Sequence, residues 1–220
     1  MALGNQSNKI YLSISDGKVV RRVVEGAEKA EPRTKKDGSI VWEQRYSFIS
    51  GYLKSISISE KSFAGQEMKD WVFELEDMGE AYTLQIMYDS RYATSLLFAL
   101  CNPVVDFSKP ITISPWMKVI DAKKKTACYL KQGEGKDNNI DWYFTKDTPH
   151  GMPDLVQTKF KGKDVWDSYD RMQFLEKFVE ENVKPKLKNG YTHLAVDSEP
   201  DYSSPDDLSY RPEDDDSLQF

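Results

Sequence analysis

The chain has 220 residues, of which 39% are hydrophobic, 12% aromatic and 30% charged, so it can form one domain with additions or two small ones. No apolar run is long enough to span a bilayer, no secretory signal is visible, and Cys101 and Cys128 are the only cysteines. These features exclude a membrane-spanning or disulfide-stapled protein and favour a cytoplasmic one with reduced thiols.

The net charge of −6 argues against nucleic-acid binding only until its distribution is considered. Residues 197–220 carry nine acidic residues and one basic residue, which gives that segment −8 and leaves +2 for the preceding 196 residues. A mildly basic body followed by a strongly acidic tail indicates two separate functions.

The N-terminal part of the chain is patterned for β-structure. Lys9–Ser15 and Lys18–Val24 predict a hairpin, because Asp16-Gly17 between them is a strong two-residue turn signal. Residues 25–39 are charged and contain proline and glycine, so we expect a mobile loop. A long strand is predicted over 41–58.

More strands and one helix follow in the middle of the chain. Gly51 within the long strand indicates a bulge or a bend. Ser90 can cap a helix that runs to about Cys101 and ends at Asn102-Pro103. Alternating apolar residues predict further strands at 70–76, 81–89, 110–120, 125–132 and 140–144.

The C-terminal third contains the clearest helix. Residues 145–165 are rich in proline and glycine and predict a loop. Apolar residues at helical spacing predict a helix over 167–188, which Pro185 is expected to shorten by a turn and Asn189-Gly190 to end. Residues 191–220 are predicted to be a disordered acidic tail.

The order of these elements predicts a mainly β protein with an OB-fold-like five-stranded barrel. Three strands, a helix and two more strands follow one another, as in that fold, within a core barrel of about 40–132. The N-terminal hairpin and the helix at 167–188 are additions, and the binding domain is 1–190. Both loops that bind oligonucleotides in OB-folds, here 59–69 and 121–125, contain lysines.

Single strands are bound where a basic groove lies beside aromatic faces. In the fourth predicted barrel strand, Trp116 and Lys118 point away from the isoleucines, and in the fifth Tyr129 and Lys131 share a face. The candidate nucleic-acid-binding residues are Trp42, Arg45, Tyr46, Lys61, Lys69, Trp116, Lys118, Lys123, Lys124, Lys125, Tyr129 and Lys131.

Core packing is the alternative for each aromatic residue. For Trp116 and Tyr129 the sequence supports core packing and base stacking equally. The rings of Trp71, Phe73, Tyr82 and Tyr88 are expected in the core. Glu74 and Glu76 lie on the outer side of their predicted strand, where they would repel phosphate. A nucleic acid would therefore run nearer the 121–131 hairpin.

The last seven residues have the composition of a peptide that binds a partner protein. Asp214, Asp215 and Asp216 precede Ser-Leu-Gln-Phe, so acids can steer the tail to a basic partner while Leu218 and Phe220 fill a pocket. This tip resembles that of bacterial and bacteriophage single-stranded DNA-binding proteins, in which several aspartates precede a short apolar end finishing in Phe. The usual Ile-Pro-Phe ending of that family is replaced here by Ser-Leu-Gln-Phe.

The resemblance implies single-stranded DNA binding in replication, recombination and repair, with the tail recruiting partner proteins. It further implies a phage or bacterial origin, and hence the cytoplasm of a bacterial host. The sequence leaves homo-oligomerisation, and the choice between DNA and RNA, open.

No enzyme, metal or cofactor is predicted. His150 and His193 lack metal-ligand spacing to the cysteines, and residues 133–136 lack the spacing of a phosphate-binding P-loop. Two alternatives to DNA binding stay open: a virion structural or assembly protein that binds no nucleic acid, and a nucleic-acid-processing enzyme on the same barrel.

Overall fold

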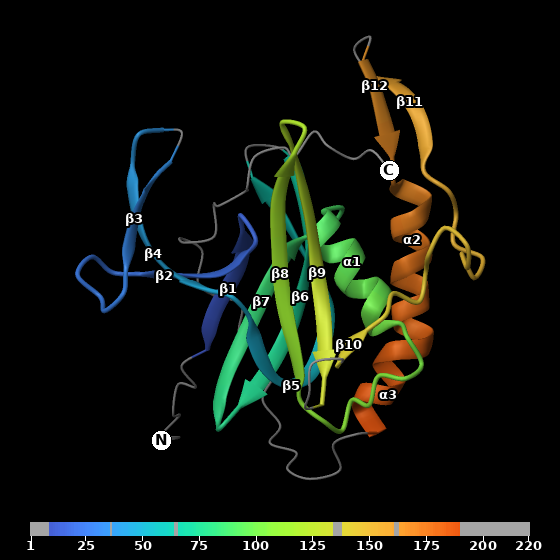
Figure 1. The fold of residues 1–220 in the computed structure, drawn as a ribbon, viewed down its shortest axis with the longest axis horizontal. Coiled ribbons are helices and arrows are strands. Elements are labelled where there is room, and N and C mark those ends of the chain that lie inside the picture. Colours follow the sequence, from blue (N-terminus) through green and yellow to red (C-terminus); the bar gives the residue numbers. More distant parts are fainter. Residues whose placement is uncertain (1–8, 36, 64–65, 134–137, 161–162, 190–220) are drawn as a thin grey trace.

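A computed structural model of the chain describes residues 9–35, 37–63, 66–133, 138–160 and 163–189. The predicted acidic tail, with Asp214, Asp215, Asp216, Leu218 and Phe220, lies outside the described residues. Within them the protein is mainly β (Figure 1). No helix in this part of the chain is both long and apolar enough to cross a membrane.

In the described residues ten strands form one curved sheet, in the order β10-β9-β8-β5-β6-β7-β1-β2-β4-β3, and two more form a separate hairpin. The strands are β1 Ile10–Ser15, β2 Lys18–Val23, β3 Glu31–Thr34, β4 Ile40–Tyr46, β5 Ile49–Phe63, β6 Gln66–Asp77, β7 Glu80–Met87, β8 Ile111–Ile120, β9 Lys123–Gln132, β10 Asn139–Ile140, β11 Val156–Phe160 and β12 Lys163–Asp167. The helical segments are α1 Arg91–Leu100, α2 Tyr169–Phe178, η1 Val179–Val183 and α3 Lys184–Asn189.

The core lies between the sheet, α1 and the long C-terminal helix (Figure 1). As predicted, Ser90 caps α1, its side chain accepting a hydrogen bond from Ala93 N. Most of α1 is buried, and α2, η1 and α3 cover it with a stripe of apolar side chains. This stripe consists of Met172, Leu175, Val179, Val183 and Leu187. Trp71 and Phe73 lie in the core, as predicted.

The predicted strand over 41–58 is two strands, which is a correction to the sequence interpretation. β4 ends at Tyr46 and pairs with β2 and β3, whereas β5 begins at Ile49 and pairs with β6 and β8. The β2–β4–β3 part forms a wing that extends from the body (Figure 1). Local sequence could not show the break because it depends on which distant strands each half pairs with.

Gly51 was predicted to mark a bulge or a bend, and the structure also shows a close approach of two backbones there. A Cβ there would lie 3.0 Å from the carbonyl oxygen of Glu76, and the β5–β6 register shifts nearby, between Leu53 and Ser55. Beyond Gly51 the strand β5 separates from β8, since their pairing covers only Ile49–Gly51 and Ile111–Ile113. The buried Pro115 therefore lies where β8 has a paired strand on one side only.

The sheet is not closed into a barrel in the part of the chain that the structure describes. The β7 edge that barrel closure would require pairs instead with β1, in parallel. The turn of the β1–β2 hairpin packs against β8: a Cβ on Gly17, whose φ is +70°, would lie 2.7 Å from Met117 N. The N-terminal hairpin thus occupies the position expected for a closing strand pair.

Two C-terminal predictions are also corrected. The segment predicted as a loop over 145–165 contains the β11–β12 hairpin, and the strand predicted at 140–144 reduces to β10. Pro185 does not shorten the helix. A proline ring clashes with the carbonyl group four residues earlier in a regular α-helix. The preceding turn η1 is a π-helix, in which Lys184 N–H bonds to Val179 O, and the helix continues to Asn189.

Candidate nucleic-acid interface

The β8–β9 hairpin carries the densest group of predicted site residues. Its strands pair from Ile111↔Gln132 to Ile120↔Lys123, and Asp121 and Ala122 form the two-residue turn with φ of 52° and 60°. The turn is shorter than predicted, so all three lysines at 123–125 lie in β9. Because side chains alternate, the pairing decides which of them share a face.

The outer face of this hairpin combines aromatic rings with lysines. The inner face is closed against α1 by Ile111, Ile113, Cys128 and Leu130. The opposite face, here called the β8–β9 outer face, consists of Thr112, Ser114, Trp116, Lys118, Lys125, Ala127, Tyr129 and Lys131, with Lys123 beside the turn.

Trp116 and Tyr129 are surface residues rather than core residues. Their exposed fractions are 37% and 40%. Their ring centroids lie 6.4 Å apart at an interplanar angle of 72°. Opposite the indole of Trp116 is the small side chain of Ala127. The hairpin therefore presents two large rings side by side to solvent.

Trp142 extends this aromatic surface, and the sequence analysis missed it. Its ring stacks on Tyr129 at 6.4 Å and 11°, and it also makes an edge-to-face contact with the core residue Phe98. Trp142 follows β10, which pairs with β9. Nothing in the local sequence indicates that pairing, so no signal could have found this residue.

The lysines of the β8–β9 outer face lie close to the rings. Lys118 is directly opposite Lys125, and Lys131 is opposite Thr112. The pair concentrates positive charge beside the rings, which suits a polyanion that binds across both strands.

A buried hydroxyl group fixes the hairpin to the body. Ser95 Oγ accepts a hydrogen bond from Cys128 N at 2.7 Å and donates one to Arg91 O at 2.6 Å. This bond joins α1 to β9 one residue before Tyr129. The ring of Tyr129 is thereby held on a strand with a fixed position over the helix.

Lys124 has a different environment from its neighbours. It lies on the opposite face of β9 and forms an ion pair with Asp16 at 3.0 Å. The hydrogen bond from Lys124 and the nearby charge of Arg45 hold the pKa of Asp16 below its usual value. The structure therefore brings Lys124 and Arg45 together at the β1–β2 turn, away from the β8–β9 outer face.

Trp42, Arg45 and Tyr46 lie on the wing, and not with the main group. Trp42 and Tyr46 share one face of β4, and Arg45 lies on the other, as predicted. On that other face Glu43, only 1% exposed, accepts hydrogen bonds from Arg33 at 2.7 Å and Arg45 at 3.0 Å. Much of the positive charge of Arg45 is thus used inside the wing.

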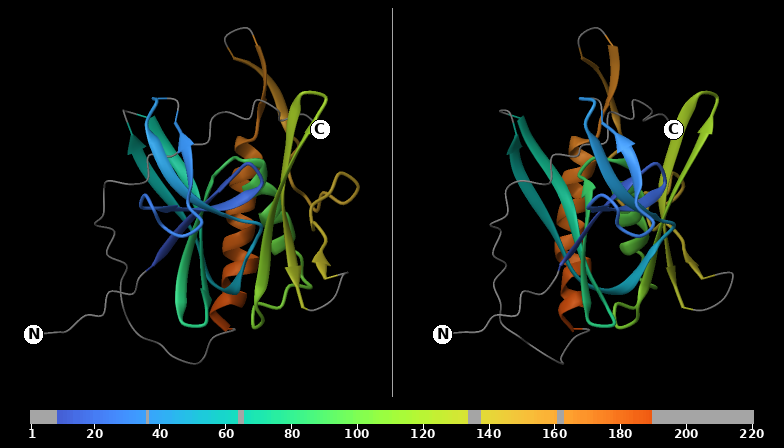
Figure 2. Two further views of the ribbon diagram at one scale, coloured as in Figure 1. Left: turned by 60° about the vertical axis from the view of Figure 1, so that its left-hand side comes forward. Right: turned by 90° about the vertical axis from the view of Figure 1, so that its left-hand side faces the viewer.

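Lys61 and Lys69 lie in strands β5 and β6, not in the predicted loop at 59–69. Lys69 pairs with Glu60 at 2.6 Å and lies 5.9 Å from the centre of the Tyr88 ring. The β5–β6 and β8–β9 hairpins point toward the same end of the molecule (Figure 2). The outer face of β6 carries Glu74, which bonds to Lys9 and Ser55.

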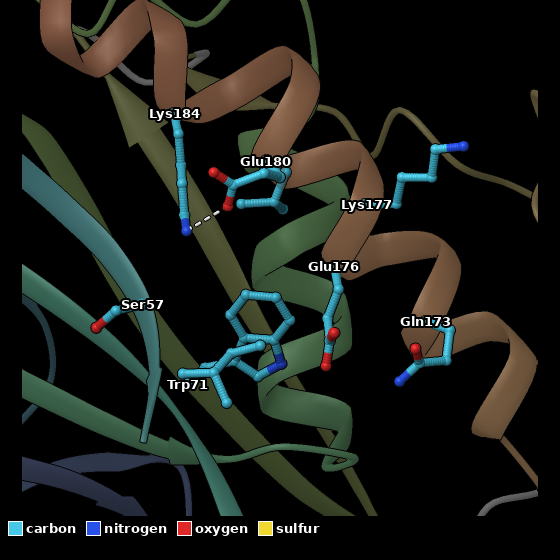
Figure 3. Close-up of a pocket in the computed structure, with 9 residues that line it drawn as sticks. Ser57, Trp71, Gln173, Glu176, Lys177, Glu180 and Lys184 are labelled. Carbon is cyan, nitrogen blue, oxygen red and sulfur yellow. Dashed lines mark ion pairs between the residues drawn. The ribbon is translucent and has the colours of Figure 1, made fainter. Parts of the chain in front are cut away.

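A pocket of about 340 Å³ lies elsewhere, between β5, β6 and the C-terminal helix (Figure 3). The indole nitrogen of Trp71 points into it beside Glu176, and Tyr88 donates a hydrogen bond to the same carboxylate. Lys184 pairs with Glu180 at 2.5 Å, and Lys177 is the remaining charged lining residue. Two acids balance two lysines, so this pocket has no net charge to attract phosphate.

The described residues offer no group of three or more His, Cys, Asp or Glu side chains that could hold a metal ion. Burial raises the pKa of the Cys101 thiol to about 12, and that of Cys128 is raised as well. Neither thiol ionises near neutral pH. His150 stacks on Tyr143 at 4.1 Å in an exposed loop.

Comparison with models of protein families, with curated proteins and with solved structures finds no match for this chain.

Proposed function

We propose that the protein binds single-stranded DNA without sequence preference, through the β8–β9 outer face, during replication or recombination. The observation that carries this proposal is the cross-strand pair Lys118–Lys125 beside the exposed rings of Trp116 and Tyr129. Lysines neutralise phosphates, and rings accept any base, because every base has a stacking face. Neither contact depends on base identity.

The strand order supports the OB-fold interpretation of the core. β5, β6 and β7 form an antiparallel meander, and β8 returns after α1 to lie beside β5. That is a Greek-key order, with β9 added next to β8. In an OB-fold the β5–β6 and β8–β9 turns would be the two loops that bind oligonucleotides.

The acidic residues of β6 argue for a defined path along the hairpin. Glu74 and Glu76 lie on the outer face of β6, where they form ion pairs with Lys9 and Lys54, so this face has no excess of positive charge to bind a phosphate. The β8–β9 outer face carries lysines and no carboxylate. A polynucleotide is therefore expected to follow β8 and β9 from the Lys118–Lys125 pair toward Lys131.

Salt dependence tests this function. The change is Lys118→Gln with Lys125→Gln, and Lys177→Gln on α2 is the control. Each lost phosphate contact should reduce the slope of log K against log salt by about 0.7, so the double variant should lose about 1.4 and the control nothing. The measurement is retention of labelled oligo(dT) on filters across a salt series.

Two outcomes would contradict the proposal. If the unchanged protein retains no oligonucleotide even at low salt, a virion assembly role gains support. If the oligonucleotide is degraded in the presence of a divalent metal ion, the chain is a nucleic-acid-processing enzyme instead.

We further propose that the acidic tail recruits replication or recombination proteins through Asp214, Asp215, Asp216, Leu218 and Phe220. Removing residues 197–220 takes away a net charge of −8 and should leave DNA affinity equal or higher, most clearly at low salt. Binding to a DNA replication protein of the host should be lost both in that truncation and in Phe220→Ala. A truncated protein that binds oligo(dT) much more weakly would overturn this division of roles.

A further inference from the structure

The pocket between β5, β6 and the C-terminal helix contains a buried hydrogen-bond donor without an acceptor. Trp71 is 1% exposed, and its Nε1–H finds no hydrogen-bond partner in the part of the chain that the structure describes. Figure 3 shows this nitrogen directed into the pocket, beside the carboxylate of Glu176. Buried polar groups nearly always have a partner, because leaving one unpaired is costly. The indole N–H therefore indicates a ligand that supplies an acceptor.

The indole ring of Trp71 is held in place by its neighbours. It stacks on the ring of Tyr88 at a centroid distance of 5.8 Å and an interplanar angle of 7°. Ile58 on β5 and Ile86 on β7 lie opposite Trp71 on the two neighbouring strands. Because the ring is fixed by these contacts, its nitrogen does not turn toward an acceptor elsewhere, and the acceptor has to enter the pocket.

An acceptor lies next to this donor. Tyr88 donates a hydrogen bond to Oε1 of Glu176, which leaves Oε2 of the same carboxylate for another donor. Burial, together with the hydrogen bond to Glu176, raises the pKa of Tyr88, so its hydroxyl group stays protonated and keeps donating to Oε1. The pocket thus presents an N–H group and a carboxylate oxygen side by side (Figure 3). Its ligand would carry the opposite pair, an acceptor next to a donor.

The rest of the pocket suits a small uncharged molecule with apolar faces. Its volume of about 340 Å³ is at the lower end of the range for small-molecule sites. Ile58 and Val179 contribute apolar surface, and the carboxylate of Glu180 is paired with Lys184. Val179 and Glu180 belong to the π-helical turn η1, a distortion that is frequent at functional sites.

An unpaired nucleobase has this chemistry. The base-pairing edge of each base carries an acceptor next to a donor, such as O4 and N3–H of thymine, and every base has a flat π-face. That edge is available only when the base lies outside a duplex. We propose that the pocket binds one nucleobase by its base-pairing edge, with Trp71 Nε1–H donating to the acceptor and Glu176 Oε2 accepting from the donor. The base belongs either to a free nucleoside or to a single strand, and the site does not depend on the β8–β9 outer face.

The experiment follows the indole N–H signals of the full chain, with isotope-labelled tryptophan, by NMR. The chain has five tryptophans, so the signal of Trp71 can be assigned and observed individually. Thymidine should shift this signal downfield, as a new hydrogen bond does. In 3-methylthymidine a methyl group replaces N3–H, so this nucleoside should bind at least about tenfold more weakly, the usual effect of losing a hydrogen bond to a charged group.

A pair of variants on α2 tests the acceptor. Glu176→Gln keeps the shape of the side chain but removes the charged acceptor, and it should weaken thymidine binding at least about tenfold. Lys177→Gln changes an exposed residue that also lines the pocket, and it should bind thymidine like the unchanged protein. A circular-dichroism melt of each variant establishes that it is folded. The comparison of the two nucleosides needs no substitution, so it holds even if Glu176→Gln does not fold.

The outcomes identify the source of the base and separate the two proposals. A Trp71 signal that responds to oligo(dT) as well as to thymidine indicates a base of a bound strand, and a response to thymidine alone indicates a free nucleoside. If neither shifts the Trp71 signal, or if 3-methylthymidine binds as well as thymidine, the inference is wrong. The β8–β9 site still stands in that case if oligo(dT) shifts the signal of Trp116. If thymidine shifts Trp71 while oligo(dT) leaves Trp116 unchanged, the pocket stands and the proposed function fails.

Discussion

Replacing Trp116 and Tyr129 together by alanine is expected to lower the affinity for single-stranded oligonucleotides at least about 30-fold, because each base-stacking contact is worth roughly 1–3 kcal/mol. Both rings are exposed at the surface, so their removal should leave the fold intact. The lysines remain, so residual binding should keep its salt dependence. The measurement is anisotropy of labelled oligo(dT) at constant ionic strength.

A matched control separates stacking from general surface effects. Tyr11→Ala removes an exposed ring from β1, outside the proposed path, and should not change the affinity. If the double variant also binds as tightly as the unchanged protein, bases do not stack on these rings, and the binding site lies elsewhere.

Replacing Phe144 by alanine is expected to lower the free energy of unfolding by about 3–5 kcal/mol, the usual cost of truncating a large buried aromatic side chain. Phe144 is 0% exposed. Its ring contacts Phe98 on α1 and both Phe174 and Phe178 on α2. It therefore joins the two helices, and its loss should leave a cavity between them.

Chemical denaturation followed by circular dichroism measures this effect. Phe48→Ala is the control, because Phe48 is 57% exposed and a surface substitution should change stability by only about 0.5 kcal/mol or less. A loss below about 1 kcal/mol for Phe144→Ala would mean that the segment after β10 contributes little to the core.

The sequence predicted the elements that depend on local signals. The hairpin around Asp16-Gly17 and the helix capped by Ser90 both form where the turn and the cap were recognised. The closed barrel was predicted wrongly, because the pairing of β7 with β1, which leaves the sheet open, joins distant parts of the chain. The break between Tyr46 and Ile49 was missed for the same reason.

The alternation of side chains along a strand predicted which residues of the candidate site share a face. Alternation alone placed Trp116 and Lys118 opposite the buried isoleucines of the same strand, and the structure has this arrangement. It could not separate Lys124 from its neighbours by environment, because that depends on Asp16. Nor could it find Trp142, whose position follows from β10 pairing with β9. The β11–β12 hairpin was missed because most of its described side chains are exposed and show no core pattern.

The short pairing of β5 with β8 has a mechanical consequence. Beyond Ile113, β8 pairs with β9 alone, so contacts other than strand pairing hold the hairpin there: Ser95 Oγ bonds to Cys128 N opposite Pro115, and the Gly17 turn lies against Met117. These two contacts lie on either side of Trp116 and give its ring a rigid support. A polymer that binds there would have to adapt its own backbone to the rings.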